Sequence, residues 1–280
     1  MSNKKICRIC SSANINDIKI GCNSLVFCND CDIYYNKSLP EVIFLKEYYE
    51  SDYRLTLSTE EYLTERRRLF RLPEQIQLIS KIIDFKPPPS TMLDFGCDKG
   101  YFIDEARRYG YDVFGIESNK YSSKYAGDLG LNIFKDIESI DIMADIVTMW
   151  HSLEHIPDPV GLLKKIKNNM SDGALLFIRV PAFDCKWRKI MAGKWIWLQP
   201  MNHYFHYTIK SITNFLTMSG FRVLVCEHTK PNNNITNSFN RLSNSVFRKY
   251  FSAKSSINQC LIQKLENITA VEIFTVAIKE

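Results

Sequence analysis

The residues best able to do chemistry near the start of this 280-residue chain are cysteines in two pairs. Cys7 and Cys10 form one C-x2-C pair, and Cys28 and Cys31 form a second pair after a gap of seventeen residues. Two such pairs, each on a tight turn, can direct four thiolates at one ion with tetrahedral geometry. A disulfide or a redox C-x2-C fits less well, because no βαβ pattern flanks either pair. The spacing predicts a structural zinc module over residues 1–40, with Cys22 as a spare thiol that could replace one ligand.

A glycine-containing turn, DFGCDKG at positions 94–100, follows a strand-like segment. In doubly wound sheets such a turn lets the backbone approach a cofactor at the carboxyl end of the strand. The next strand ends at Glu117, where an acid can hold a ribose diol through two hydrogen bonds. Asp98 would repel the pyrophosphate of a dinucleotide, whereas Asp94 and Asp98 together favour a cationic cofactor. The turn therefore predicts S-adenosylmethionine rather than NAD.

The elements that must position these residues alternate between strands and helices after residue 89. Strands are predicted at 91–94, 112–116, 131–134, 144–149, 174–180, 221–226 and 270–277, and helices at 101–109, 162–168 and 209–219. Such alternation indicates an α/β fold on a mostly parallel sheet. Thr208 is the expected N-cap of the last helix, which closes at Gly220.

Two further segments complete the predicted organisation. Residues 41–88 are expected to form a helical linker or lid, and the prolines at 87–89 end it where the α/β domain of residues 89–280 begins. Within the linker, helical spacing predicts one apolar face made of Leu69, Leu72, Ile76, Ile79 and Ile83. The tyrosines at 48, 49 and 53 either pack or cover the cleft. Residues 231–267 are expected to be an insertion before the last strand.

Four segments of the chain resemble the motif series of class I S-adenosylmethionine-dependent methyltransferases: MLDFGCDKGYF, VFGIES, DIVTMWHSLEHIPDP and LLFIRVP. The resemblance extends to the group with an N-terminal four-cysteine zinc module, because KWIWLQPMNHYFHYT precedes a helix ending in Gly220-Phe221. That group mostly methylates small molecules, including sugars. The resemblance implies a Rossmann-like methyltransferase sheet with helices on both faces, preceded by the zinc module and the linker. It also implies a small-molecule or nucleotide-sugar acceptor.

The resemblance assigns roles to individual residues. It places Asp94 and the backbone of residues 96–100 on the methionine moiety and Glu117 on the ribose. Asp136 matches the position that meets the adenine amine, although it could equally cap a turn. The predicted cofactor set is Asp94, Gly96, Cys97, Asp98, Gly100, Glu117, Ser118, Asp136, Trp150 and His151. Asp98 stands where the family has glycine, and aspartate tolerates a positive φ better than most residues.

A hydroxyl or acidic-carbon acceptor must lose a proton during methyl transfer, and histidine has a suitable pKa. His203 is our first candidate for this base, and His155, just past the fourth strand, is the second. His206 is the third candidate, because it leads into the helix cap and is better placed for a structural role. If that stretch is extended, His203 and His206 face opposite ways. The alternative for His203 and His206 is that they only hold the loop through backbone hydrogen bonds, and for His155 that it caps the following turn or packs against the far side of the cofactor. The tryptophans at 187, 195 and 197 suit a substrate wall or a core.

Composition limits the remaining classes. The chain is 45% apolar and 24% charged, which is ordinary for a globular protein. No apolar run reaches the ~18 residues of a membrane span, and the first residues lack the apolar core of a signal peptide. We therefore expect a soluble, cytoplasmic protein with no membrane partner. The net charge of +5 is too weak to favour nucleic acid. An RNA methyltransferase with a zinc module is the second hypothesis, and a non-catalytic zinc-anchored binding protein is the third.

Overall fold

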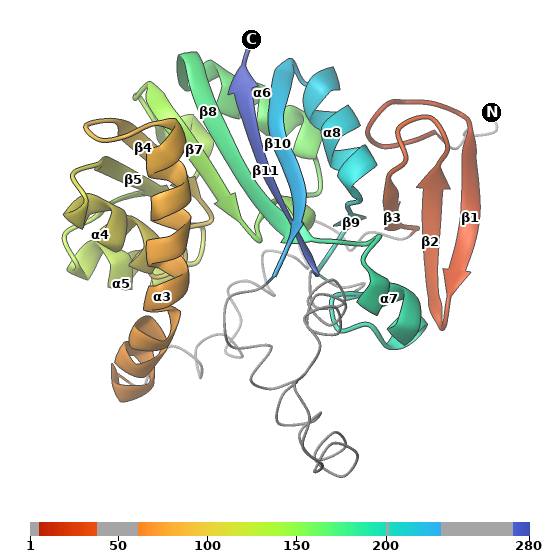
Figure 1. Ribbon diagram of the computed structural model, residues 1–280, viewed down its shortest axis with the longest axis horizontal. Helices are drawn as coiled ribbons and strands as arrows, with labels where there is room; N and C mark the ends of the chain where they lie inside the picture. Colours follow the sequence, from red (N-terminus) through yellow and green to blue (C-terminus); the bar gives the residue numbers. More distant parts are fainter. Residues whose placement is uncertain (1–5, 38–60, 200–201, 231–270) are drawn as a thin grey trace, which may run out of the picture.

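The computed structural model describes residues 6–37, 61–199, 202–230 and 271–280 (Figure 1). Its larger sheet has seven strands in the order β10-β11-β8-β7-β4-β5-β6. Six strands run in the same direction, and β11 alone is antiparallel to its neighbours β8 and β10. The bounds are β4 Thr91–Phe95, β5 Asp112–Ile116, β6 Asn132–Phe134, β7 Ala144–Trp150, β8 Met170–Pro181, β10 Phe221–Thr229 and β11 Glu272–Lys279. The predicted α/β fold with a mostly parallel sheet is confirmed.

Helices cover both faces of this sheet, and the alternation of strand side chains explains why. Met92 and Ile146 belong to the core cluster of α3, α4 and α5, whereas their neighbours Leu93 and Val147 belong to the cluster of α6 and α8. Successive strand residues point to opposite faces, so both faces are apolar and both need cover. The helices are α3 Glu61–Phe85, α4 Tyr101–Arg108, α5 Lys120–Asp128, α6 Pro159–Asn168 and α8 Ile209–Met218 (Figure 1).

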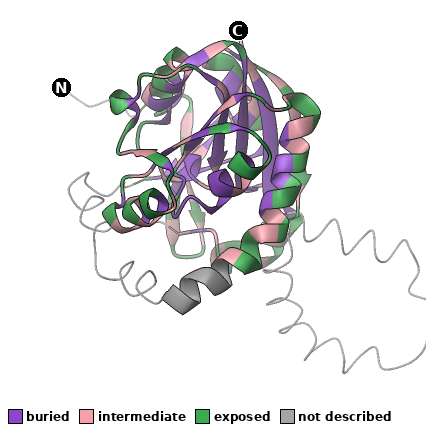
Figure 2. Cartoon of the chain, turned by 90° about the vertical axis from the view of Figure 1, so that its left-hand side faces the viewer, coloured by how far each residue is buried: buried purple, intermediate pink, exposed green. Residues whose placement is uncertain are grey.

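Helix α3 has a different buried face from the one that spacing predicts. Leu69 is 62% exposed and Ile76 is 37% exposed. Ile79 of the predicted face is fully buried, but it packs on the α4 side of the sheet together with Leu78 and Ile82, which were not predicted. Figure 2 shows this helix along the edge of the molecule, with exposed residues on its outer side. The helix is therefore present, but the predicted apolar face is wrong at Leu69 and Ile76.

A second, four-stranded sheet has the order β1-β2-β3-β9. Strands β1 (Ile15–Ile20), β2 (Asn23–Cys28) and β3 (Tyr34–Asn36) form what we call the cysteine module, residues 6–37. The fourth strand, β9 (Phe205–His206), comes from a segment that follows β3 by almost 170 residues. Three of the module's cysteines are buried in the same core cluster as residues of α6 and α8. The module thus lies on the α8 side of the larger sheet, beside β9 (Figure 1).

Local signals set several boundaries as expected. The Thr208 side chain caps α8 in a capping box with Ser211, and Asp158 caps α6, whose first residue is Pro159. The predicted lid tyrosines, residues 41–60 and the insertion at 231–267 lie outside the described residues. Among the helices that are described, none has the length and apolar character needed to cross a membrane.

Candidate active site

The turn after β4 has the backbone that a close approach of a ligand requires. Gly96 and Gly100 have positive φ angles of 80° and 72°, and Asp98 has a φ of 49°. A Cβ at Gly96 would lie 2.5 Å from Oγ of Ser152, so only glycine fits there. The structure confirms that Asp98 adopts the left-handed conformation that a glycine would otherwise supply. Its carboxylate accepts a hydrogen bond of 2.6 Å from the Ser122 hydroxyl.

Glu117 follows β5 and is fixed by the backbone on both carboxylate oxygens. Oε2 accepts from the Asp98 N–H at 3.0 Å, and Oε1 accepts from the Asn119 N–H at 2.7 Å. These two hydrogen bonds hold the Glu117 carboxylate in a fixed orientation at the carboxyl end of β5.

A cleft of about 410 Å³ opens at the carboxyl ends of β4 and β5. Four residues of the predicted cofactor set line it, namely Gly96, Glu117, Ser118 and Asp136. Asp136 also caps the short helix η1 (Ile137–Ser139) through Ser139, so both of the roles weighed for it are compatible. Sequence reasoning missed the opposite wall, which consists of Ile156, Pro157, Asp158, Gly161, Leu162 and Lys165. Its only signal is the Pro-Asp-Pro start of α6.

The remaining predicted cofactor residues lie behind this cleft or beside it. Asp94 is buried and accepts from the Thr148 hydroxyl at 2.7 Å, and burial raises its pKa to about 7. Cys97 packs toward Gly115, and burial raises the pKa of its thiol far above the usual range. Gly100 begins α4. The Trp150 indole packs between Phe102 and Phe274 in the core. These side chains shape the site from the protein interior.

His151 stands at the end of β7 with a positive φ of 54° and lies between two acids. Its Nε2 is 3.2 Å from Oε1 of Glu272, and its Nδ1 is 3.5 Å from Oε1 of Glu154. Burial lowers its pKa, but the two carboxylates outweigh burial and raise the pKa to about 9. Glu272 also accepts from Arg179 at 2.5 Å, and Arg179 reaches Glu74 of α3 at 2.6 Å. A line of alternating charges therefore runs from α3 to the site.

The structure brings His155 and His203 together with Glu154, their ligand atoms lying within 4.8 Å of one another. His155 Nδ1 is 2.8 Å from the carbonyl of Asn202, so Nδ1 carries the proton and Nε2 keeps its lone pair. His203 is buried, and burial lowers its pKa to about 4. Within the described part of the chain, the buried oxygens of Glu154 have no hydrogen-bond partner, and its ion-pair neighbour is His151, with Nδ1 3.5 Å from Oε1.

His206 lies apart from this group. Its ring stacks on Phe183 at 4.9 Å, and burial lowers its pKa to about 3. Trp197 stacks on the rings of both His151 and His203, at 5.7 and 5.9 Å. Trp195 is buried against Phe183. Trp197 thus packs against two of the histidines, and Trp195 belongs to the core.

The four cysteines of the predicted zinc site converge in the structure. The Sγ atoms of Cys7 and Cys31 are 3.6 Å apart, those of Cys10 and Cys28 are 3.5 Å apart, and all four lie within 4.8 Å. Tetrahedral zinc with Zn–S bonds of ~2.3 Å needs sulfur separations of about 3.8 Å. In each pair the residue after the second cysteine has a positive φ, 59° at Ser11 and 62° at Asp32. Cys22 is exposed in the β1–β2 turn and lies outside the cluster.

The mostly parallel sheet and the glycine turn after β4 agree with a known family of protein domains. A family model described as a methyltransferase domain matches residues 62–225, more than half of the chain. The chain belongs to this methyltransferase domain family.

The curated proteins and solved structures that resemble this chain are methyltransferases as well. The chain is 26% identical over 125 residues to the ubiquinone biosynthesis O-methyltransferase of Xanthomonas axonopodis pv. citri, covering 39% of this chain and 52% of that protein. It is 27% identical over 115 residues to the enzyme of the same name from Coxiella burnetii, covering 38% and 48%. The chain thus spans about half the length of the curated relatives it matches.

Two solved structures share the fold. An S-adenosylmethionine-dependent methyltransferase from Archaeoglobus fulgidus has a TM-score of 0.54 and 19% identity, over 79% of this chain and 100% of that one. The plantazolicin methyltransferase BpumL, solved in complex with SAH, has a TM-score of 0.53 and 16% identity, over 84% and 94%.

Proposed function

We propose that this protein is an S-adenosylmethionine-dependent methyltransferase with a small-molecule or nucleotide-sugar acceptor. The observation that carries the proposal is the cleft where Gly96, Glu117, Ser118 and Asp136 meet. S-adenosylmethionine, when bound, supplies an electrophilic methyl group. Glu117 offers the ribose an oriented carboxylate, and the backbone of the glycine turn allows close approach.

We place the acceptor on the side of His155 and His203. His155 is the better candidate for the base, because it is half-buried and its Nε2 is held ready to accept a proton. His203 is the second candidate, because burial disfavours its protonated form. His206 contributes to the structure, as its packing on Phe183 suggests.

Relatives support a small acceptor. Their names refer to ubiquinone biosynthesis and to plantazolicin. The weak net charge of +5 gives no basis for an RNA substrate. We further propose that Cys7, Cys10, Cys28 and Cys31 hold a structural zinc, since four thiolates leave no coordination position for a substrate.

Calorimetry on the full chain tests the function. We expect S-adenosylmethionine and S-adenosylhomocysteine each to bind at one site per chain. Methyl-labelled cofactor then identifies the acceptor among nucleotide sugars, phenols and total RNA. No binding of either cofactor form would refute methyl transfer, and labelling of RNA alone would refute a small acceptor.

A further inference from the structure

The cysteine module reaches into the acceptor side of the site through a shared sheet. Residues 202–208, which we call the histidine segment, contain β9, and β9 pairs antiparallel with β3. In this register Tyr34 lies opposite His206, and Tyr35 lies opposite Phe205. The histidine segment therefore supplies the fourth strand of the module's sheet. At Tyr207 it also bridges to Ala182, directly after β8, where the Phe183 N–H donates to the Tyr207 carbonyl at 2.8 Å.

Asn36, at the end of β3, makes the most specific contacts across this junction. It is 3% exposed, its backbone N–H donates to the carbonyl of Tyr204 at 3.0 Å, and Nδ2 donates to the carbonyl of His203 at 2.8 Å. Oδ1 lies 3.4 Å from Nε2 of His206. Because Nδ2 serves as the donor, Oδ1 is the acceptor, so Nε2 of His206 carries the proton. One side chain thus holds two of the three candidate histidines.

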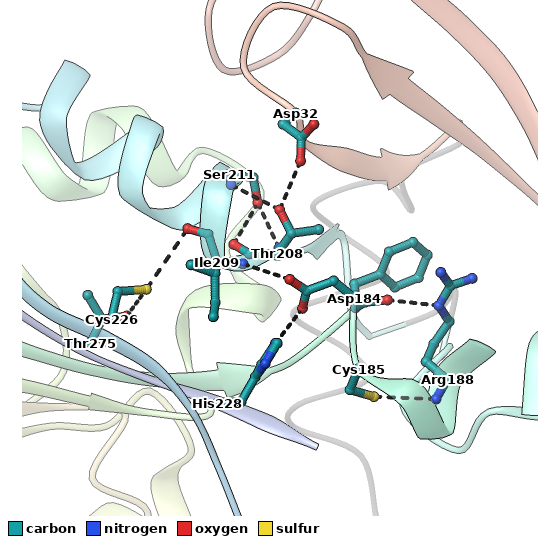
Figure 3. A network of polar contacts seen from close by, with 11 residues as sticks. Asp32, Asp184, Cys185, Arg188, Thr208, Ile209, Ser211, Cys226, His228 and Thr275 are labelled. Carbon is teal, nitrogen blue, oxygen red and sulfur yellow. Dashed lines mark hydrogen bonds and ion pairs between the residues drawn. The ribbon is translucent and has the colours of Figure 1, made fainter. Parts of the chain in front are cut away.

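Asp32, directly after the last cysteine of the cluster, holds the far end of the segment. Its Oδ2 accepts from the hydroxyl of Thr208 at 3.0 Å, and Thr208 caps α8 (Figure 3). The positive φ of Asp32 belongs to the turn that brings Cys28 and Cys31 together. The geometry of the sulfur cluster and the start of α8 are therefore coupled through one residue.

The opposite side of the segment is fixed by the motif after β7. The Tyr204 N–H donates to the carbonyl of Glu154 at 2.8 Å, and the carbonyl of Asn202 accepts from Nδ1 of His155. The segment is thus held between the cysteine module and the residues proposed to act on the acceptor. The cofactor cleft is separate from these contacts. Among the described residues that line the cleft, none belongs to the cysteine module or to the histidine segment.

We infer that the cysteine module positions the acceptor side of the site, and that Asn36 is its positioning residue. The module fixes the backbone of the histidine segment, and the segment in turn sets the orientation of His155 and the place of His203. The cofactor cleft is lined by other residues, namely the turn after β4, Glu117 and the wall that begins at Ile156. The inference rests on the methyl transfer proposed above, because that function makes this the acceptor side.

Amide hydrogen exchange on the full chain tests the role of the module. We expect zinc removal by a chelator to raise exchange in residues 202–208 by at least tenfold, with the affinity for S-adenosylhomocysteine changed by less than threefold. Unchanged exchange would overturn the inference, and so would a parallel loss of cofactor affinity. Failure of the untreated protein to bind S-adenosylhomocysteine would instead refute the proposed function and leave the exchange result standing.

Variants of Asn36 separate positioning from simple stability. We expect Asn36→Ala to abolish the Nε2–H tautomer of His206, read from the ¹⁵N shifts of its imidazole, and to raise exchange in residues 202–208 at least tenfold. Asn36→Asp keeps the acceptor oxygen and should retain the tautomer. The control is Asn29→Ala, which removes hydrogen bonds to Asn14 within the module and leaves the segment untouched. An unaltered tautomer and exchange in Asn36→Ala, or equal changes in Asn29→Ala, would overturn the role of Asn36.

Discussion

The two halves of the candidate site are assembled from the chain in different ways. The cofactor half uses consecutive strand–turn–helix units, so the turn at 94–100, Glu117 and Asp136 follow one another along the sequence. The acceptor half joins Asn36, His155 and His203, which come from three distant segments. When the residues of a site follow one another along the chain, the local turn fixes their geometry. When they come from distant segments, their geometry depends on which strands pair. Patterns of residues therefore predict the first half much better than the second.

The largest effect should come from the four-cysteine cluster of the module, which we propose holds zinc. We expect wild-type protein to contain about one zinc per chain by mass spectrometry, and Cys28→Ser/Cys31→Ser to contain almost none. The midpoint of thermal unfolding should fall by more than 10 °C, because structural zinc contributes about 10–16 kcal/mol to small zinc domains. Cys22→Ser is the matched control, since this exposed thiol lies outside the cluster. Metal-replete wild type without zinc would contradict the proposal.

The next effect belongs to the cofactor half. Glu117→Ala removes two charge-assisted hydrogen bonds to the ribose, each contributing about 1.5–3 kcal/mol. Since about 1.4 kcal/mol corresponds to tenfold, affinity for S-adenosylmethionine should fall at least tenfold in calorimetry. Glu138→Ala is the control, because Glu138 lines the same cleft but is exposed and paired with Lys165. Equal affinities for wild type and Glu117→Ala would show that the cofactor lies elsewhere.

The same contrast explains which parts of the fold could be predicted. The strand at 112–116 was predicted at its observed limits, and the Thr208 cap of α8 was correct, because both follow from short-range rules. Helix α5 was missed, since Lys120–Asp128 has only two buried residues and little apolar periodicity. In α3 the spacing predicts a helix but does not fix the face that meets the sheet, and the buried face is centred on Leu78, Ile79 and Ile82.

In the site, the missing information is long-range. The spacing of the four cysteines identifies their cluster, and the glycine turn with Glu117 identifies the cleft. Nothing near Asn36 in the sequence indicates that it lies beside His203 and His206, 167 and 170 residues away. The pairing of His151 with Glu272 is equally hidden, because it depends on the antiparallel return of β11.

A smaller effect should appear in the pH dependence of stability. His203 and His206 have folded-state pKa values of about 4 and about 3, below the ordinary 6.5. The unfolded chain therefore takes up these protons first, and stability falls as pH drops below 6.5, by about 1.4 kcal/mol per pH unit for each histidine. His151, with a pKa of about 9, acts in the other direction. Its contribution is complete below pH 6.5 and is lost as pH rises toward 9.

Urea unfolding at a series of pH values between 5 and 9 measures the loss of stability on the acid side and on the alkaline side. We expect His203→Asn to reduce the slope of the unfolding free energy against pH, on the acid side, by the equivalent of about one proton. Glu272→Gln should reduce the loss of stability on the alkaline side, because His151 then loses one of its two carboxylate neighbours. An acid slope that is the same in wild type and His203→Asn would contradict the buried, neutral state of this histidine.

The smallest effect should follow Asp98→Gly, which restores the glycine of the family pattern in the cofactor turn. The change removes the bond from the Ser122 hydroxyl to a carboxylate, about 1.5–3 kcal/mol, and adds backbone entropy to the unfolded chain, roughly 0.5–1 kcal/mol. Glycine relieves a left-handed conformation that costs other residues about 1–2 kcal/mol. These contributions change the stability of the protein and partly offset one another, whereas the Asp98 N–H that donates to Glu117 is retained. We therefore expect cofactor affinity within threefold of wild type, whereas Gly100→Ala, whose Cβ would lie 2.5 Å from Leu131, should disrupt the turn. A tenfold gain of affinity in Asp98→Gly would show that the aspartate impairs cofactor binding, and a tenfold loss would make its carboxylate a direct cofactor ligand.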